Sequence, residues 1–242
     1  GKSLITTAST GAKTRVGSYE LSTQEPVPGM YPYEDIYIQM VDTPPITNRS
    51  TQSRLYGLLR TSDVFVFVAD LTNNPVAQTE ESFSELSEWG FDLLDINTEI
   101  TENTNIYTTK PTIIVCNKAD IPGALDQFQE MEHKFSNEFP VIMCSAEENV
   151  GLDELGEEIF SALNIMRVYT KSPRERLQDF QKKDPIVLSI GSSVGEAAHQ
   201  VHKDLSRGLK YAVLWGQSGK FDGQHVGRNH ELIDGDIIEI HS

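Results

Sequence analysis

The stretch "TIIVCNKAD", residues Thr112–Asp120, decides the fold of the larger part of the chain. Its first five residues form a nearly continuous run of apolar and β-branched side chains, which is typical of a strand covered on both faces. A similar run, "VFVFVA", occupies residues 64–69, and shorter runs occupy residues 36–41 and 141–144. Helical patterns lie between them, at residues 49–62, 78–94 and 151–164. Strands that alternate with helices predict an α/β fold with a mostly parallel sheet.

The character of the sequence changes after Asn164. The residues that follow contain four short strand patterns, at residues 167–171, 185–190, 210–215 and 236–242. They surround one helical pattern at residues 192–209, which predicts a small mixed sheet packed on a single helix. We therefore expect two domains, residues 1–165 and residues 166–242. Residues 170–185 are a charged linker segment, and the polar, aperiodic residues 97–109 predict a surface insertion.

Charge is distributed unevenly between these two parts. Residues 1–165 hold 9 Lys and Arg against 26 Asp and Glu, a balance of −17, whereas residues 166–242 hold 11 against 10, a balance of +1. An acidic body repels phosphate backbones. Any contact with nucleic acid is therefore expected to use the basic side chains of the tail.

The sequence has no run of about 18 apolar residues and no basic-then-apolar leader, so we expect neither membrane insertion nor secretion. The expected location is cytoplasmic. The two cysteines, Cys116 and Cys144, are too few for a disulfide framework and lack the spacing of metal ligands. Each stands at the end of an apolar run, which favours buried, reduced thiols.

Asn117, Lys118 and Asp120 follow the strand pattern at residues 112–116 and form the motif Asn-Lys-x-Asp. Open α/β sheets bind ligands at the carboxyl ends of their strands. An aspartate there can accept two hydrogen bonds from the N1–H and the exocyclic amine of guanine, a pair of donors that adenine lacks. The asparagine can contact the base or brace the phosphate loop, and the lysine stem can lie along the purine. A surface turn is the alternative, but the position between a strand and a helix favours guanine recognition.

Gly1, Lys2 and Ser3 match the end of the phosphate-binding pattern G-x-x-x-x-G-K-[ST]. In such a loop, backbone N–H groups surround phosphates at the start of a helix, the lysine reaches the terminal phosphates, and the hydroxyl binds Mg²⁺. We expect that this domain lacks its first strand and the start of the loop. A cloning remnant is the alternative explanation of the tripeptide.

Ser145 and Ala146 follow the strand pattern at residues 141–144. The hydroxyl of Ser145 can order the loop, and the N–H of Ala146 can meet the guanine O6. A GTPase is expected to carry a phosphate-binding loop, a switch threonine, Asp-x-x-Gly, Asn-Lys-x-Asp and Ser-Ala, in this order and at strand ends. Four of these five are present in order, and Asp-x-x-Gly is partly matched by residues 42–45. The series predicts guanine nucleotide binding.

Five further stretches carry a resemblance to a known family: "YELSTQEPVPGM", "VDTPPI", "NKADIPGA", "RVYTK" and, most specific of all, "HKDLSRGLKYAVLWGQSGKFDGQHVGRNHELIDGDIIEIHS" at residues 202–242. They resemble Obg-related GTPases, and among these the developmentally regulated GTP-binding proteins with a C-terminal TGS domain. The resemblance covers nearly the whole chain. It implies a P-loop GTPase domain with a mostly parallel sheet, followed by a small β-grasp (ubiquitin-like) TGS domain associated with RNA or ribosome binding. The family usually has an N-terminal helical region as well, which this sequence does not include.

The resemblance also implies roles for single residues. Lys2 would bind the β and γ phosphates, Ser3 would bind Mg²⁺, and Asp42 would hold the ion through a water molecule. Thr23, or else Ser22, would be the switch threonine that closes onto Mg²⁺ and the γ-phosphate. The family usually has Tyr-Pro-Phe-Thr-Thr where residues 19–23 read "YELST", so the choice of hydroxyl stays open. Catalysis would rest on Thr23, Asp42 and Lys2, with GTP or GDP and Mg²⁺ as ligands.

Pro44 and Pro45 stand where a typical GTPase donates a glycine N–H to the γ-phosphate, and proline has no N–H. Since a hydrogen bond to a charged group contributes roughly 1.5–3 kcal/mol, the distinction between GTP and GDP should weaken by about one or two powers of ten. Ile46 cannot orient the attacking water as glutamine does in many GTPases. We predict slow hydrolysis that a protein activator accelerates, and the resemblance adds K⁺, which some relatives use. A simple strand end is the alternative reading of the prolines.

Basic and aromatic side chains are interleaved in the tail, at Lys203, Arg207, Lys210, Tyr211, Trp215, Lys220, Phe221 and Arg228. Such a mixture can stack on bases and neutralise phosphates, although core packing also explains Tyr211 and Trp215. The expected partner is the ribosome or another structured RNA. The leading hypothesis is a GTP-dependent switch that acts there. The alternative is a regulatory protein-binding module that holds guanine nucleotide with little or no turnover.

Other kinds of site are not supported by the sequence. His199 and His202 have the spacing of one helical turn, but no third metal ligand is evident, and one face of a helix explains them more simply. A tRNA-synthetase-like or alarmone-synthetase-like protein would share the tail, but no catalytic segment of that kind is present.

Overall fold

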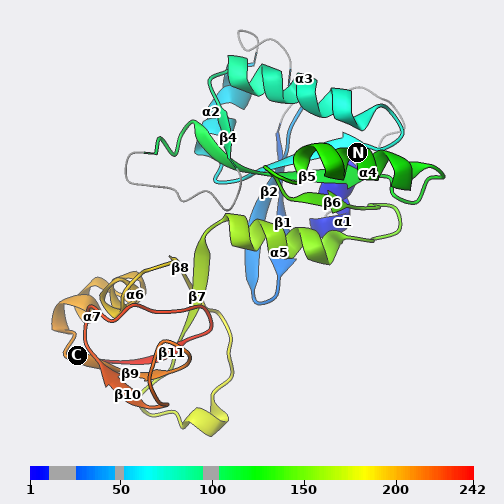
Figure 1. The fold of residues 1–242 in the computed structure, drawn as a ribbon. Helices are drawn as coiled ribbons and strands as arrows, with labels where there is room; N and C mark the ends of the chain where they lie inside the picture. The colour runs from blue at the N-terminus through cyan, green and yellow to red at the C-terminus, as the bar shows by residue number, and fades with distance from the viewer. Residues whose placement is uncertain (11–25, 47–51, 95–103) are drawn as a thin grey trace. The chain divides into compact units, whose positions relative to one another are not determined.

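The computed structural model describes residues 1–10, 26–46, 52–94 and 104–242. The chain separates into two compact units, of which the first comprises Gly1–Tyr33 and Tyr37–Leu163 and the second comprises Glu34–Ile36 and Asn164–Ser242 (Figure 1). The elements of the first unit are α1 (Lys2–Thr10), β1 (Val27–Tyr33), β2 (Ile36–Asp42), α2 (Ser53–Thr61), β3 (Phe65–Asp70), α3 (Pro75–Glu88), β4 (Asp92–Leu94), β5 (Thr109–Asn117), α4 (Ala124–Phe135), β6 (Val141–Met143) and α5 (Leu152–Ala162).

A parallel sheet forms the centre of the first unit. Strand β5 pairs with β3 and β6, and its first residues pair with β4, all in parallel. Every residue of β5 from Lys110 to Asn117 is buried, which explains the apolar run in the sequence. The register places Asp70, the last residue of β3, opposite Asn117, the last residue of β5. The predicted α/β fold with a parallel sheet is confirmed.

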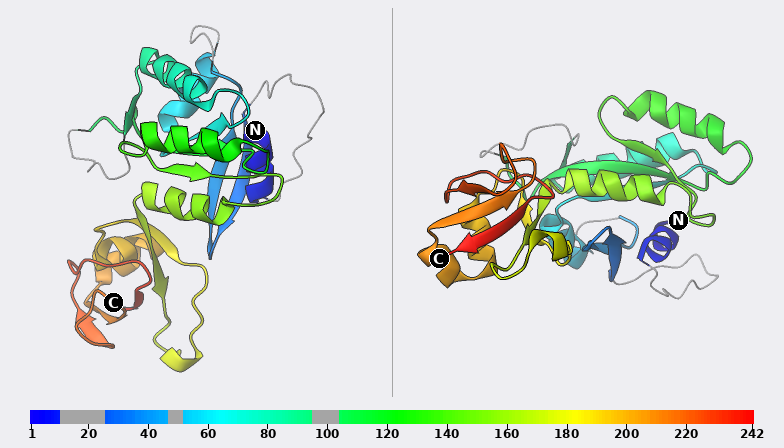
Figure 2. Two further views of the ribbon diagram at one scale, coloured as in Figure 1. Left: turned by 45° about the vertical axis from the view of Figure 1, so that its right-hand side comes forward. Right: turned by 90° about the horizontal axis from the view of Figure 1, so that it is seen from below.

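Helices cover both faces of this sheet. Figures 1 and 2 show α3 and α4 side by side over one face and α5 over the other. Met131 and Phe135 of α4 are buried in one cluster with Ile114 of β5. Phe83 of α3 joins this cluster through edge contacts with Phe67 and Phe135, with ring centroids 5.4 and 6.1 Å apart. This packing fixes the strands whose carboxyl ends carry the predicted site residues.

Lys110 is a fully buried cation beside this core. Its side chain is 2% exposed, and its Nζ donates to the carbonyl oxygens of Arg60 (3.0 Å), Ser62 (2.5 Å) and Ile106 (2.8 Å). Two of these carbonyls lie at the C-terminal end of α2, where a helix has acceptors without intrahelical partners. Because an ammonium group has three N–H donors, all of them are used. Burial lowers the pKa of Lys110.

Both cysteines lie in this core. The N–H of Cys144 donates to the carbonyl oxygen of Cys116 over 2.9 Å, which joins β5 to the residue after β6. Neither cysteine forms a disulfide, and both are buried. Burial raises the pKa of Cys116 to about 12 and that of Cys144 to about 11. The predicted buried, reduced thiols are confirmed.

Three details of the first unit differ from the sequence-based prediction. Strand β2 pairs with β1 in a separate two-stranded sheet, and prolines at 28 and 32 hide β1 in the sequence because they interrupt a strand pattern. The helix predicted for residues 78–94 ends at Glu88, since Gly90 has a φ of 86° and the chain turns into β4. The three helical ranges given above for this unit omit α4, although its buried residues Ala124, Met131 and Phe135 recur at the helical spacing i, i+7 and i+11.

The elements of the second unit are β7 (Ile165–Thr170), a 3-10 turn (Leu177–Asp179), β8 (Ile186–Ser189), α6 (Val194–Val201), α7 (Lys203–Gly208), β9 (Tyr211–Trp215), β10 (Gln224–Val226) and β11 (Ile237–His241). The strands form one mixed sheet in the order β10-β9-β11-β7-β8. Val168, Leu214 and Ile238 of the sheet are buried together with Val194 and Ala197 of α6. A small mixed sheet on a helix is the predicted arrangement.

The helix predicted for residues 192–209 is divided in two. His202 has extended backbone angles, φ −166° and ψ 136°, and its Nδ1 accepts a hydrogen bond from the N–H of Asp204 over 3.2 Å. This residue ends α6 and caps α7. The expectation that His199 and His202 share one helical face is therefore wrong, because His202 lies in the break and not in a helix.

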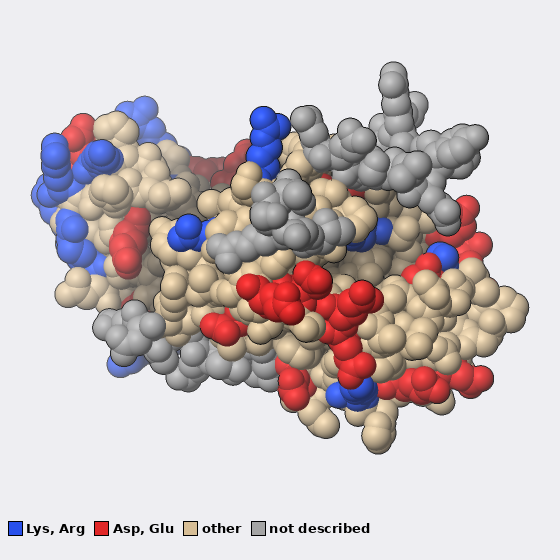
Figure 3. Space-filling view, turned by 90° about the horizontal axis from the view of Figure 1, so that it is seen from above, with Lys and Arg blue, Asp and Glu red and all other residues tan. Residues whose placement is uncertain are grey.

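The two units differ in surface charge. Figure 3 shows carboxylates gathered over the first unit and lysine and arginine side chains over the second. This matches the balance of −17 in residues 1–165 and +1 in residues 166–242. Among the described residues, no helix is long and apolar enough to span a bilayer.

Candidate nucleotide-binding site

The carboxyl ends of β3, β5 and β6 bring polar residues to one edge of the parallel sheet. Asp70 and Asn117 end β3 and β5, and Ser145 lies two residues after β6. Adjacent parallel strands place these ends side by side, and the N–H of Leu71 donates to the carbonyl oxygen of Asn117 over 3.1 Å. This is the edge at which open α/β sheets bind their ligands.

Asn117 and Ser145 arrange the loops at this edge. The side chain of Asn117 is 2% exposed, and its Oδ1 accepts from the N–H of Ala146 over 3.1 Å. Ser145 Oγ donates to Asp120 Oδ1 over 2.6 Å and accepts from the N–H of Glu148 over 3.1 Å. Asn117 thus braces the loop that contains Ala146. A base oxygen that accepted from the N–H of Ala146 would share this donor with the side-chain amide of Asn117. Asp120 itself is exposed and held from one side by a neutral hydroxyl.

Lys118 has an unusual backbone that its neighbours stabilise. Its φ is 73°, in the left-handed region that favours glycine. The N–H of the following Ala119 donates to the carbonyl oxygen of Cys144, 3.0 Å away, and that of Ile121 donates to the carbonyl oxygen of Lys118, 3.2 Å away. Lys118 Nζ lies 2.6 Å from Asp70 Oδ2. The strained backbone turns the lysine toward the end of β3.

Gly1, Lys2 and Ser3 lie at the same edge of the sheet. A Cβ built on Gly1 would lie 3.7 Å from the side chain of Val68 in β3. The charges of Lys118, Asp70 and Asp42 lie close enough to act on Gly1. Burial lowers the pKa of Lys2, and the negative charge of Asp42 opposes this shift. The residues predicted to bind phosphate and base are therefore neighbours around β3.

Lys2 opens helix α1, so the N-terminal end of this helix faces the edge where the other residues gather. The carbonyl oxygen of Gly1 accepts from the N–H groups of Leu4 and Ile5, each over 3.1 Å, which shows that the helix starts at this point. The first N–H groups of a helix lack intrahelical acceptors and carry partial positive charge. This arrangement suits a phosphate.

The proposed magnesium ligands are oxygen donors, as that ion requires. Ser3 contributes a hydroxyl beside Lys2, and Asp42, which ends β2, is a buried carboxylate that is 4% exposed. Thr23 and Ser22 lie outside the described residues. Among those described, no group of three or more His, Cys, Asp or Glu side chains could hold a metal by itself. Mg²⁺ commonly takes one or two protein oxygens together with phosphate and water, and this donor set fits it.

Two contacts hold the C-terminal end of the segment that contains the two prolines. The Nε2 of Gln52 donates to the carbonyl oxygen of Pro45 over 3.0 Å. The side chain of Ile46 packs against a cluster that includes Leu55, Phe65 and Trp89. Ile46 is therefore part of the hydrophobic packing between α2 and the sheet.

Sequence reasoning missed two residues at this edge, Asp70 and Thr72. Burial raises the pKa of Asp70, but hydrogen bonds from Lys118 and Thr72 outweigh it, so that the pKa is lowered overall. The signal in the sequence is the position of Asp70. It directly follows the run "VFVFVA", just as Asn117 directly follows "TIIVC".

Two family models match the chain. A model described as a 50S ribosome-binding GTPase matches residues 1–118, and a model described as a TGS domain matches residues 166–242. Together with the parallel sheet and the mixed sheet, they define the class of protein: a P-loop GTPase domain followed by a C-terminal TGS domain.

Its homologues are developmentally regulated GTP-binding proteins and related GTP-binding proteins. "GTP-binding protein 1" of Schizosaccharomyces pombe is 28% identical over 99% of this chain and 79% of its own length. "Developmentally-regulated GTP-binding protein 2 homolog" of Dictyostelium discoideum is 27% identical over the same shares. The crystal structure of a GTP-binding protein from Pyrococcus horikoshii superposes with a TM-score of 0.65 at 18% identity, over 100% of this chain and 96% of that one. This likeness supports the fold.

Proposed function

We propose that this protein is a guanine nucleotide switch that hydrolyses GTP slowly and acts on the ribosome through its TGS domain, with a GTPase domain over residues 1–165 and a TGS domain over residues 166–242. The observation that carries the proposal is the placement of Asp120. Its carboxylate is fixed by Ser145 at the edge of the sheet where Lys2 opens α1. A purine read by Asp120 would therefore have its phosphates near a lysine and a helix N-terminus.

Calorimetric titration with GDP, GTP and ATP tests this function. Guanine nucleotides are expected to bind with Mg²⁺ and ATP is not, because adenine cannot supply the donor pair that a carboxylate requires. GTP and GDP are expected to bind with similar affinity, since Pro45 offers no N–H to the γ-phosphate. The titration is made on the 242-residue chain and on a chain extended at its N-terminus by a complete phosphate-binding loop. Equal binding of ATP by both would contradict the proposal.

Hydrolysis without a partner is expected to proceed at about 10⁻³ per second or below, as for an unassisted small GTPase. The physical reason is that Ile46 packs into the cluster beside α2 and cannot hold the attacking water. Phosphate release is measured with and without ribosomes and with K⁺ or Na⁺. Several turnovers per second by the isolated protein would show that this reasoning is wrong, and no acceleration under any condition would favour the alternative of a nucleotide-holding regulatory module.

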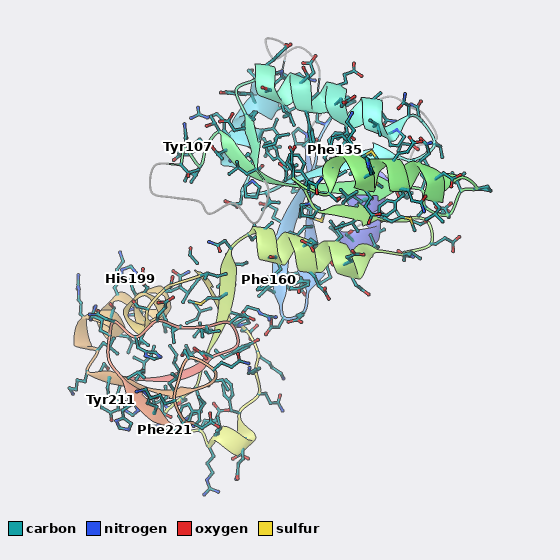
Figure 4. The ribbon with its side chains drawn as sticks, in the orientation of Figure 1. Tyr107, Phe135, Phe160, His199, Tyr211 and Phe221 are labelled. Atoms are coloured by element: carbon teal, nitrogen blue, oxygen red, sulfur yellow. The ribbon has the colours of Figure 1, made fainter. Side chains whose placement is uncertain are left out.

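The sheet of the TGS domain offers a surface that supports an RNA partner. Tyr211 of β9 stacks between His225 of β10 and His241 of β11, with ring centroids 4.6 and 4.5 Å apart and planes within 7° and 11°. The next residues along β9, Ala212 and Leu214, alternate with Tyr211 and point into the core under α6. The column of rings therefore lies on the face away from α6, and Figure 4 shows Tyr211 apart from the His199 side of that helix.

Removal of the central ring tests this surface. Tyr211→Ala is expected to weaken co-sedimentation with ribosomes by about 10-fold. It removes the ring that holds His225 and His241 in the column, and stacking of a base on an outer ring contributes roughly 1–3 kcal/mol. Added salt should weaken binding of the unmodified protein as well, since phosphate contacts release counterions. Tyr37→Ala, which removes a 70% exposed ring on β2, is the matched control and should bind as the unmodified protein does. Equal binding by all three proteins would exclude this face as the RNA contact.

A further inference from the structure

Asp70 and Thr72 anchor the Lys118 side chain. Asp70 Oδ2 lies 2.6 Å from Lys118 Nζ. The other oxygen, Oδ1, accepts from the N–H of Thr72 over 2.9 Å and from its Oγ1 over 2.6 Å. Thr72 Oγ1 in turn lies 3.3 Å from Lys118 Nζ, within hydrogen-bond reach. Both carboxylate oxygens are therefore committed, and the ammonium group has two anchors, one at the end of β3 and one on the loop that follows.

The end of β3 and the loop after it, which carry these anchors, are themselves braced. Gln78 of α3 accepts from the N–H of Asp70 over 3.4 Å and donates back to the carbonyl oxygen of Asp70 over 3.4 Å. Gln78 also donates to the carbonyl oxygen of Asn73. The N–H of Asn73 in turn donates to the carbonyl oxygen of Asp70. With Asp70 opposite Asn117 in the sheet register, the anchors are held in a fixed relation to the Asn-Lys-x-Asp segment.

We propose that Asp70, with Thr72, is a positioning residue of the guanine nucleotide site, which holds the Lys118 stem in the place where it packs along the purine. The proposal rests on the function proposed above, because it assigns Lys118 to the base. Asp70 does not touch the nucleotide in this scheme. It acts by restraining a side chain that otherwise has several freely rotating bonds.

Conformational entropy explains why such an anchor has an effect. A lysine side chain loses considerable rotamer freedom when it becomes ordered, and that loss opposes binding if it happens only when the nucleotide arrives. Here the Lys118 side chain is already ordered before the nucleotide binds, by its ion pair with Asp70. The side chains of Lys118 and Asp70 are 39% and 31% exposed. Water screens a pair of that exposure, so the gain is modest. Affinity for the nucleotide, rather than the choice between guanine and adenine, is the property that should depend on it.

A double-mutant cycle on the affinity for GDP tests the proposal. Asp70→Asn is expected to weaken GDP binding about 5-fold, in line with a partly exposed pair. Lys118→Ala is expected to weaken it about 10-fold, because it removes the stem itself. In the Lys118→Ala background, Asp70→Asn should have no further effect, since there is no side chain left to position. Asp70→Asn should still bind GDP and not ADP, as the unmodified protein is expected to do.

The matched control is Glu80→Gln, which removes one carboxylate of the exposed ion pair with Lys134 on the same unit. It should leave GDP affinity unchanged, and thermal unfolding midpoints should agree among all variants. Unchanged GDP affinity in Asp70→Asn, or the same loss with and without Lys118, would overturn the positioning role while the proposed function stands. Failure of the unmodified protein, and of the chain extended by a complete loop, to bind any guanine nucleotide would overturn both.

Discussion

Asp120→Asn is expected to lower the affinity for GDP by about 100-fold or more, since two hydrogen bonds to a charged group contribute roughly 1.5–3 kcal/mol each. The carboxylate of Asp120 is exposed at the sheet edge, and Ser145 Oγ donates to its Oδ1 over 2.6 Å, which sets its direction. An asparagine in that place presents one oxygen and one NH₂ group. The NH₂ group would face the amine of guanine, donor against donor.

The same substitution should create a new preference. Xanthine has a carbonyl oxygen where guanine has its exocyclic amine, so the NH₂ of the new asparagine meets an acceptor. Xanthosine diphosphate is therefore expected to bind Asp120→Asn better than GDP does, with the order reversed in the unmodified protein. Calorimetric titration of both nucleotides into both proteins measures this reversal.

Glu147→Gln is the matched control for Asp120→Asn. Glu147 is an exposed carboxylate in the loop that follows Ser145, so its loss changes the local charge by the same amount without removing the base contact. It should retain the preference for GDP. A control variant that lost guanine selectivity, or an Asp120→Asn protein that kept it, would show that some other group reads the base.

Lys110→Met is expected to reduce the free energy of unfolding by about 3 kcal/mol, because unsatisfied buried polar groups cost roughly 1–3 kcal/mol each. Methionine retains most of the stem, so the effect comes from three carbonyl oxygens, those of Arg60, Ser62 and Ile106, that lose their donor. Two of them end α2, which adds the loss of a favourable cation at a helix C-terminus. Urea unfolding followed by circular dichroism measures the change.

Lys134→Met provides the comparison for this stability effect. Lys134 is the exposed partner of Glu80, with a side chain that is 42% exposed. Its replacement should alter the free energy of unfolding by less than about 0.5 kcal/mol. If the two lysine variants unfolded at the same urea concentration, Lys110 would not be the structural clamp that its contacts indicate.

The sequence predicts the parts of the fold that are marked by an unbroken apolar run. The runs at residues 64–69 and 112–116 are buried on both faces, and burial of that kind requires an unbroken apolar sequence. Motif positions follow from those strands, because Asn117 and Asp70 end adjacent strands and Ser145 closely follows a third. The predicted fold is confirmed for this reason, while the roles of the individual site residues remain predictions.

Other features depend on contacts that leave no mark in the local sequence. The break at His202 arises because its side chain caps the following helix, although the residues around it have helical periodicity. The burial of Lys110 depends on carbonyls 48 and 50 residues away along the chain. The anchoring of Lys118 by Asp70 and Thr72 likewise joins two strand ends that only the sheet register brings together.

The two buried thiols immediately precede Asn117 and Ser145, the residues that organise the base-reading edge. Since each sulfur is enclosed by the sheet and its helices, a reagent can reach it only when these strands separate from their neighbours. The two native cysteines are therefore expected not to react with a thiol reagent while this edge is intact. Their reaction would report local opening of the edge.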